Sequence, residues 1–213
     1  MAKRTVKAAR PLLSTRDRMV AGAADLLRRR GVAATSLREV VRHTGTPRGS
    51  LGHHFPEGKA QLLEEAIVFS RQHVSRQLRR ALDEFGSIRG LRVFADSWRS
   101  ILESTAFEAG CPVMAVAIEQ ATDDSGTELR AQRRLLVLAT EAFDEWAGLL
   151  AESLRGAGVP ESRARSLAML AISAFEGAIG VCRAARHCQP LDDVADELDL
   201  MFRHAIVAGR ALR

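Results

Sequence analysis

The chain has 213 residues, of which 46% are hydrophobic and 27% charged, a composition typical of a folded protein and not of a disordered one. No apolar run approaches the roughly 18 residues that cross a bilayer, the basic N-terminus lacks the apolar block of a secretory signal, and three cysteines at no framework spacing favour a reducing cytoplasm. The net charge of +5 is uneven, because residues 1–80 carry 17 Lys and Arg against 6 Asp and Glu whereas residues 81–213 carry 14 against 20, so the N-terminal part is the one suited to a polyanion.

The first 13 residues form a basic arm that contains Lys3, Arg4, Lys7 and Arg10. A flexible basic tail ahead of a DNA-binding domain can enter the minor groove or lie along the phosphate backbone. A solvated tail without a partner is the alternative for this segment.

A first helix is expected from Thr15 to Arg30, because apolar side chains recur on one face at helical spacing: Val20, Ala23, Ala24 and Leu27. Ser36 and Glu39 have the spacing of a capping box, in which each side chain satisfies a backbone amide of the other. This pattern predicts a second helix that ends near Thr44 and Gly45.

A third helix should begin where Thr46 caps it and Pro47 takes the first position, and it should run to about His54. Leu51 and Phe55 are expected to seat this helix on the first two. Two short helices joined by a tight turn, the second of them basic, form the arrangement that places side chains in the major groove of DNA. We therefore predict a helix-turn-helix domain over residues 14–58.

The candidate DNA contacts come from this helix pair: Ser36, Arg38, Thr46, Arg48, Gly49, Ser50, His53, His54 and Lys59. Arg48 is suited to guanine, Ser50 and His53 can reach bases or phosphate, and Gly49 leaves room for close approach to the backbone. His54 and Lys59 are better placed for phosphate. The alternative is that the two histidines pack or face solvent, and a metal role lacks a third ligand.

The segment from about Ser14 to Ile67 resembles the DNA-binding domain of the TetR (tetracycline-repressor-type) family of bacterial regulators. The residues that carry the resemblance are Thr35-Ser36-Leu37-Arg38-Glu39, Gly45, Arg48-Gly49-Ser50-Leu51, His53-His54-Phe55, Lys59 and Leu62. One position departs, since Gly52 stands where this family usually has tyrosine, and the chain has no tyrosine at all. The lost aromatic contact to phosphate weakens DNA binding, which Arg48, His53 and the basic arm could offset.

The resemblance implies an all-α protein in which a three-helix helix-turn-helix domain precedes a larger helical domain, residues 59–213, for ligand binding and dimerisation. A long helix should run from Glu57 or Lys59 to Phe85. The helices expected after it cover residues 88–107, 112–121, 126–155, 160–187 and 191–211.

Eight residues are candidates for a ligand cavity in the larger domain: Trp98, Phe107, Cys111, Met114, Ile118, Phe143, Trp146 and Phe175. The aromatic ones lie in helices that enclose a cavity in the family, although an apolar stripe is also what a plain core needs. The Gly110–Met114 segment breaks the helix at Pro112 and resembles that of a TetR subgroup that responds to planar aromatic or multidrug-like compounds. Glu119 or Gln120 could anchor a ligand or face water.

The last two helices have wide apolar faces with small residues, which in the family form a four-helix dimer interface. The candidate interface residues are Leu170, Ala174, Gly177, Ala178, Val181, Leu198, Met201 and Phe202. A purely intramolecular core is the alternative. A two-fold dimer would require a palindromic operator in double-stranded DNA.

These patterns predict a cytoplasmic DNA-binding transcriptional regulator, a homodimeric repressor released by a small apolar or aromatic ligand. No cofactor or metal is expected, and CxxC spacing for a sensing role of the cysteines is missing. An enzyme is disfavoured because no nucleophile elbow, phosphate loop or metal motif occurs. The remaining alternative is a helical small-molecule-binding or interaction protein that binds DNA weakly and without sequence preference.

Overall fold

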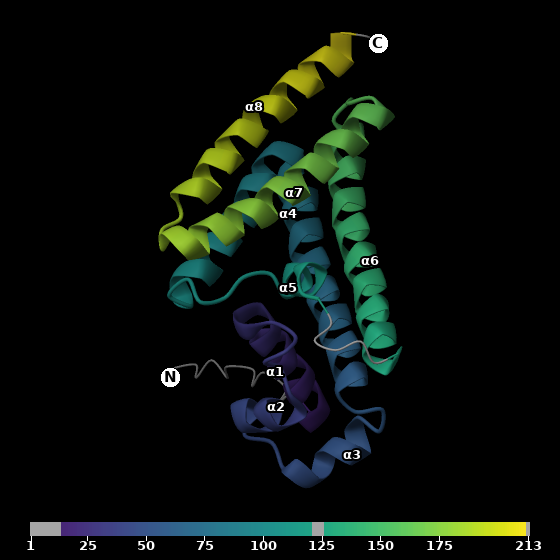
Figure 1. Ribbon diagram of the computed structural model, residues 1–213. Helices are drawn as coiled ribbons and strands as arrows, with labels where there is room; N and C mark the ends of the chain where they lie inside the picture. The colour runs from purple at the N-terminus through teal and green to yellow at the C-terminus, as the bar shows by residue number, and fades with distance from the viewer. Residues whose placement is uncertain (1–13, 121–125, 212–213) are drawn as a thin grey trace, which may run out of the picture.

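The computed structural model describes residues 14–120 and 126–211, and every regular element within them is helical (Figure 1). The elements are α1 (Thr15–Arg30), α2 (Leu37–Thr44), the 3₁₀ turn η1 (Arg48–Ser50), α3 (Leu51–His54), α4 (Lys59–Ser104), α5 (Pro112–Ile118), α6 (Gly126–Gly156), α7 (Glu161–Ala185) and α8 (Gln189–Ala211). The expected all-α fold is confirmed. The basic arm of residues 1–13 lies outside the described residues.

The second helix begins at the predicted cap, Ser36, and the first begins at a cap that was not predicted, Ser14. The amide of Asp17 donates to Ser14 Oγ at 3.0 Å, and that of Glu39 donates to Ser36 Oγ at 3.2 Å. Only half of the expected capping box forms, because the Glu39 carboxylate accepts from Arg42 at 2.7 Å instead of turning back to Ser36.

The third helix does not begin as predicted. Thr46 is buried, and its hydroxyl is hydrogen-bonded to Thr44 Oγ1 at 2.8 Å, so it caps nothing. Pro47 precedes the helical turn in an extended conformation instead of occupying its first position. The chain enters through the tight turn η1, in which the Ser50 amide donates to Pro47 O at 3.2 Å, before α3 follows.

The helix α4 consists of two rods joined at Gly86, where φ is 73° and ψ is −179°. This conformation is strained for any residue with a side chain, so glycine allows the chain to change direction here. The predicted break after Phe85 is therefore confirmed. The second rod ends at Ser104, three residues before the position expected from the sequence.

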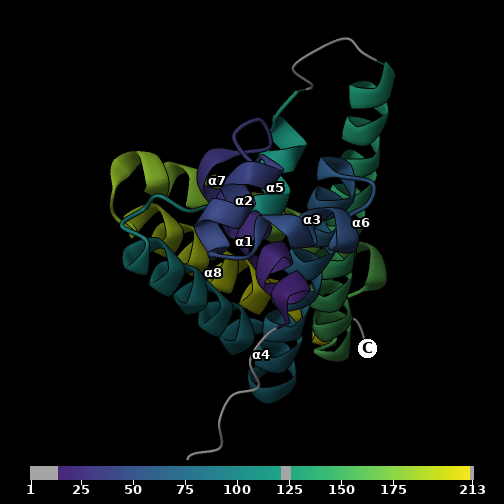
Figure 2. The same cartoon turned by 90° about the horizontal axis from the view of Figure 1, so that it is seen from below.

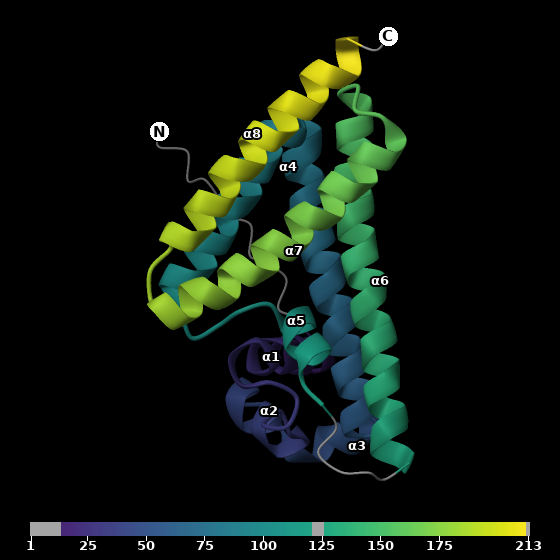
Figure 3. The ribbon, with the colours of Figure 1, turned by 45° about the horizontal axis from the view of Figure 1, so that its top comes forward.

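The helices of the C-terminal part surround α4. The first rod of α4 runs beside α6, α7 packs on α6 and α8, and α8 packs back on α4 (Figures 1 and 3). The helices α1, α2 and α3 cluster near the end of α4 that begins at Lys59. In the view from below they lie in front of that end of α4 (Figure 2). Between the two groups lies α5, which contacts α1, α4 and α6.

Within residues 14–120 and 126–211, one helix is long and apolar enough to cross a membrane by length and composition, although no apolar run of that length was expected. It is α7, Glu161–Ala185, with a mean hydropathy of 1.5 over an 18-residue window. Half of that window is buried in the protein, against α6 and α8. Packing in the core accounts for the apolar residues on the buried side of this helix.

Candidate functional site

The predicted DNA-contact residues lie in α2, η1 and α3, in the turns beside them, and at Lys59, the first residue of α4. These elements lie together at the lower end of the molecule in Figure 1 and face the viewer in Figure 2. Arg38, Arg48, Gly49 and His53 are exposed, whereas Ser36, Ser50, His54 and Lys59 are half-buried. Thr46 is the exception, because its side chain is 5% exposed and bonded to Thr44. Its role is to close the turn, and it is too buried to reach DNA.

Apolar residues seat this surface on the rest of the domain, as predicted. Phe55 is 2% exposed and lies under the guanidinium of Arg16 at 5.5 Å from the ring centre, and Leu51 packs against the same core. Arg18 donates to the carbonyl of Thr44 at 2.7 Å and so fixes the turn between α2 and η1. These contacts hold η1 and α3 against the rest of the domain, while Arg48, Gly49 and His53 stay exposed.

Arg30, Arg42 and His43 each pair with a carboxylate, whereas Arg48 makes no ion pair within the described part of the chain. Hydrogen bonding from Arg42 lowers the pKa of the Glu39 carboxyl, and the same contact raises the pKa of Arg42. A cation on an exposed turn without a protein partner is available to an anionic one. Gly52 faces open space, and a side chain built there would meet nothing within 4 Å.

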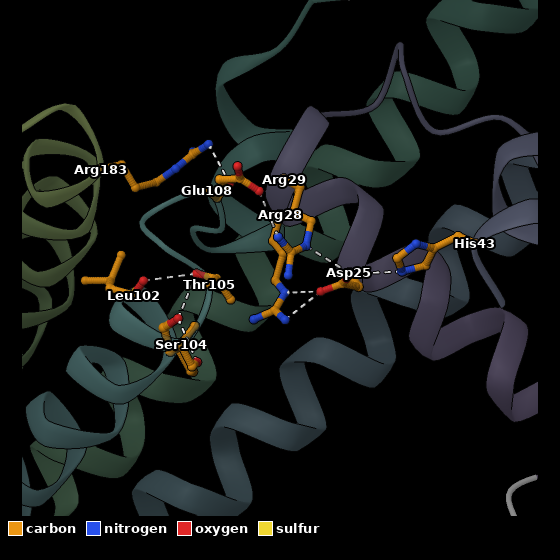
Figure 4. A network of polar contacts seen from close by, with 10 residues as sticks. Asp25, Arg28, Arg29, His43, Leu102, Ser104, Thr105, Glu108 and Arg183 are labelled. Atoms are coloured by element: carbon orange, nitrogen blue, oxygen red, sulfur yellow. Dashed lines mark hydrogen bonds and ion pairs between the residues drawn. The ribbon is translucent and has the colours of Figure 1, made fainter. Parts of the chain in front are cut away.

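A polar network ties α1 to the C-terminal helices (Figure 4). Asp25 accepts from Arg28 at 2.8 Å and Arg29 at 3.0 Å, and it pairs with His43 of α2 at 2.9 Å. Burial opposes ionisation of Asp25, but the bonds and charges of the two arginines outweigh burial and lower its pKa.

The network continues toward α7. Arg29 reaches Glu108 at 3.4 Å, and Arg183 donates to the Glu108 carbonyl at 3.1 Å (Figure 4). The amide of Gly110 donates to Arg28 O at 2.8 Å. The last turn of α1 is thus attached to the α4–α5 connection and to α7.

Glu119, just after α5, makes two short polar contacts to the turn that follows α1. Its carboxylate accepts from the amides of Val32 at 2.6 Å and Ala33 at 2.7 Å, in the turn that follows α1. Gln132 of α6 donates to the Glu119 carbonyl at 2.7 Å. The Glu119 carboxylate therefore binds two backbone amides of the turn between α1 and α2, and neither of the two roles expected from the sequence, ligand anchor or water-facing side chain, includes these contacts.

A cavity of about 420 Å³ lies between the end of α1, α5 and α7, and we call it the interdomain cavity. Three of the predicted ligand residues line it: Cys111, Met114 and Ile118. Leu27 and Gly31 contribute walls from α1 and its C-terminal cap. The cavity therefore has walls from both parts of the chain, which the sequence alone did not indicate.

The other predicted ligand residues lie elsewhere. Trp98 lines a second cavity of about 210 Å³ between α1 and α4, and Phe107 lines a surface hollow beside Arg186. Phe143, Trp146 and Phe175 line neither of these spaces nor the interdomain cavity. They pack as pairs, Phe143 with Trp146 at 5.5 Å and Phe175 with Phe94 at 6.0 Å between ring centres, which is how core residues pack.

Sequence reasoning missed Glu176, which lines the interdomain cavity from α7 and is 7% exposed. The thiol of Cys111 hydrogen-bonds to this carboxyl, while Glu176 Oε2 has no hydrogen-bond partner among the described residues. Burial raises the pKa of Glu176 to about 7, against an ordinary value of 4.5. Burial and the Glu176 charge together raise the pKa of Cys111. A signal was present, because Glu176 is the one charged residue between Arg165 and Arg183.

The remaining cysteines show no arrangement for metal binding. Cys182 and Cys188 are free and buried, and burial raises the pKa of both thiols. Across residues 14–120 and 126–211 no group of three His, Cys, Asp or Glu side chains could hold a metal ion.

The exposed turn-and-helix surface, carried on a helical body with a cavity beside α1, is the arrangement of a helix-turn-helix regulator. Residues 19–66 match the family described as bacterial regulatory proteins, tetR family, and residues 87–197 match the LmrA/YxaF-like transcriptional regulator, C-terminal domain. An uncharacterized HTH-type transcriptional regulator of Mycobacterium tuberculosis is 42% identical, over 86% of this chain and 91% of its own length. The chain belongs to the TetR family of transcriptional regulators, whose members bind DNA operators and ligands, form dimers and are not enzymes.

More distant relatives agree with this assignment. The HTH-type transcriptional regulator LmrA of Bacillus subtilis is 28% identical over 83% of this chain and 90% of its own length. A TetR transcriptional regulator from Chloroflexus aurantiacus has a TM-score of 0.64 and 29% identity, over 87% of this chain and 92% of its own. One from Legionella pneumophila, at 19% identity, shares the fold with a TM-score of 0.75, over 90% of this chain and 99% of its own.

The contact of Glu119 predicts that both carboxylate oxygens contribute to stability. In the Glu119→Gln variant one oxygen becomes an NH₂ group that faces a backbone N–H, so one amide of the turn loses its acceptor. We expect a loss on the order of 1–3 kcal/mol in the free energy of unfolding, measured by urea denaturation. Glu152→Gln, on an exposed position of α6, is the matched control. Equal midpoints for the two variants would contradict this role.

The raised pKa of Glu176 predicts a pH-dependent difference in stability between the wild type and Glu176→Gln. The folded carboxyl keeps its proton to a higher pH than the unfolded one, so its stabilising contribution is complete below about 4.5 and is lost as the pH rises through about 7. The wild type should therefore lose stability relative to the variant, on the order of 3 kcal/mol in total across this range. Thermal unfolding of both proteins between these pH values measures the difference, and a constant difference would refute the assignment.

Proposed function

We propose that two copies of this chain bind a palindromic operator and repress transcription, and that a small apolar or aromatic compound releases them by binding in the interdomain cavity. The observation that carries the proposal is that this cavity has walls from both α1 and α7. A ligand there contacts the DNA-binding domain and the helical body at once. Because a ligand shifts an equilibrium only by its difference in affinity for two forms, a site that both domains build is suited to control their relative position.

DNA recognition rests on the exposed face of α2, η1 and α3. Arg48 is exposed and free of ion pairs within the described residues, and guanidinium groups pair with guanine through two hydrogen bonds. The charge balance of residues 1–80 supplies attraction to phosphate that does not depend on sequence. We assign residues 14–58 to DNA binding and residues 59–213 to ligand binding and dimerisation.

Dimerisation rests on the outer faces of α7 and α8. Large apolar side chains are exposed there, because no other described part of the protomer covers them: Met169, Leu170, Val181, Leu200 and Val207. Of the predicted interface residues, Leu170, Gly177 and Val181 are exposed, and Ala174 and Met201 are half-buried. Ala178, Leu198 and Phe202 are buried in the protomer's own core, so they support this face from beneath.

The Arg48→Ala variant tests the recognition proposal. A random-duplex selection with the wild type should enrich a palindrome at moderate salt, and the variant should lose at least one conserved position in each half-site, with affinity about tenfold or more lower. Arg79→Ala, which removes an exposed charge from α4, is the control and should select the same palindrome.

Enrichment of no sequence, with binding that simply weakens as salt rises, would leave only phosphate attraction. The protein would then be a helical ligand-binding protein with weak DNA affinity. Gly52→Tyr is the variant to examine in that case, since the position is open and can accept an aromatic ring.

The Val181→Glu variant tests the dimer face. Val181 is 54% exposed in the protomer, so the change leaves the core intact but places two carboxylates in a two-fold interface. We expect a monomer at micromolar concentration in sedimentation velocity and a loss of operator affinity. Val137→Glu, at a 48% exposed position of α6, is the matched control and should stay dimeric. A dimeric Val181→Glu protein would place the interface elsewhere.

A further inference from the structure

The interdomain cavity contains an acid whose position the fold alone does not explain. Glu176 is 7% exposed, and its Oε2 has no hydrogen-bond partner among the described residues. Around it the wall is formed by Met114, Ile179 and the thiol of Cys111. A buried polar atom without a partner is costly and rare in folded proteins, and a bound group that satisfies it removes the cost.

The other charged side chains that line the cavity already make polar contacts within the protein. Arg28 and Arg29 pair with Asp25, and Arg30 lies 3.6 Å from Glu39. The carboxylate of Glu119 holds two backbone amides of the α1–α2 turn.

Arg183 is engaged through its terminal nitrogen, which donates to the Glu108 carbonyl, while its Nε is buried without a partner. It lies two helical turns beyond Glu176 on α7, about 11 Å along the axis. The Nε of Arg183 can donate to an oxygen of a ligand, but that bond would leave Glu176 Oε2 without a partner.

We propose that the interdomain cavity takes a small apolar, aromatic molecule that carries one protonated amine, and that the amine donates to Glu176 Oε2. The proposal rests on the ligand site proposed above and specifies the class of compound. An ammonium group matches a carboxylate in charge and in hydrogen bonding, and at a carboxyl as buried as that of Glu176 such a bond is stronger than a bond between neutral groups. The apolar walls of Met114 and Ile179 then cover the aromatic part.

Proton equilibria support this choice. The pKa of Glu176 is raised to about 7 by burial, with the Cys111 thiol as its bonded neighbour, so the acid becomes ionised between pH 6 and 8. An alkyl ammonium keeps its proton throughout this range, as a lysine side chain does. Affinity for an amine should therefore rise from pH 6 to pH 8, whereas affinity for a neutral compound of the same shape should not.

Two matched probes test the proposal on the full-length protein: 2-naphthylmethylamine and 2-naphthylmethanol, which differ in charge and hardly in shape. Isothermal titration at pH 7.5 should give at least about tenfold tighter binding of the amine. Glu176→Gln should remove this preference by weakening the amine while leaving the alcohol unchanged. Glu152→Gln, on the exposed face of α6, should bind both probes like the wild type.

A second pair of measurements keeps the test independent of how well Glu176→Gln folds. The wild type titrated at pH 6 and pH 8 should show the rise in amine affinity, and Met114→Trp, which fills the cavity, should weaken both probes. Equal binding of amine and alcohol, tighter binding of 2-naphthylacetate, or an amine affinity unaffected by Glu176→Gln would each overturn the proposal.

Different results would disprove the role of Glu176 and the regulatory function. If neutral aromatic compounds release the selected operator and the amine does not, the regulatory function stands and the role of Glu176 is wrong. If the amine binds through Glu176 but leaves operator affinity unchanged, the site is right and the switch is wrong.

Discussion

The placement of the DNA-binding surface depends on the carboxylate of Glu119, which accepts from the amides of Val32 and Ala33 in the turn after α1. Backbone N–H groups in such a turn need acceptors, and a charged acceptor is the stronger kind. The carbonyl of the same residue is held by Gln132 of α6. One residue thus links the turn between α1 and α2 to the helical body, and α5 is held against α1 as a consequence.

The first helix is fixed at both ends by different partners. Its N-terminal turn is paired to α4 through Arg16 and Glu65 at 2.7 Å, and its last turn is bonded to Gly110 through the carbonyl of Arg28. The interdomain cavity adjoins only the second of these ends. A ligand in the cavity would therefore contact α1 only at its C-terminal end.

Local signals predicted most of the helix boundaries, because caps and breaks depend on residues close in sequence. Ser36 caps α2 and Gly86 breaks α4 where the pattern placed them. The predicted start of the third helix was wrong, because the buried hydroxyl of Thr46 bonds to Thr44 instead of to the helix that follows. Tertiary packing determines which of these two bonds forms.

The composition of the site was less predictable than the fold. Periodicity shows that Phe175 or Phe202 faces inward, but it does not distinguish core, cavity and dimer interface, since the partners come from other helices. Phe175 meets Phe94 of α4, and Phe202 is fully covered within the protomer. Glu176 stood out as a charge in an apolar stretch, but its bonded neighbour Cys111 lies 65 positions earlier, a distance that no local pattern spans.

The free energy that a ligand must supply to release the operator can be compared with the free energy of the contacts that the cavity offers. A hundredfold loss of operator affinity corresponds to about 2.7 kcal/mol of difference in ligand affinity between the two forms of the protein. Burial of an aromatic ring and one charge-assisted hydrogen bond can each contribute about 1.5–3 kcal/mol. A cavity whose walls come from α1 and α7 keeps those contacts only while the two helices hold one spacing. The difference between forms is therefore within reach of a single small molecule, because movement of α1 would break the site as well as the operator contacts.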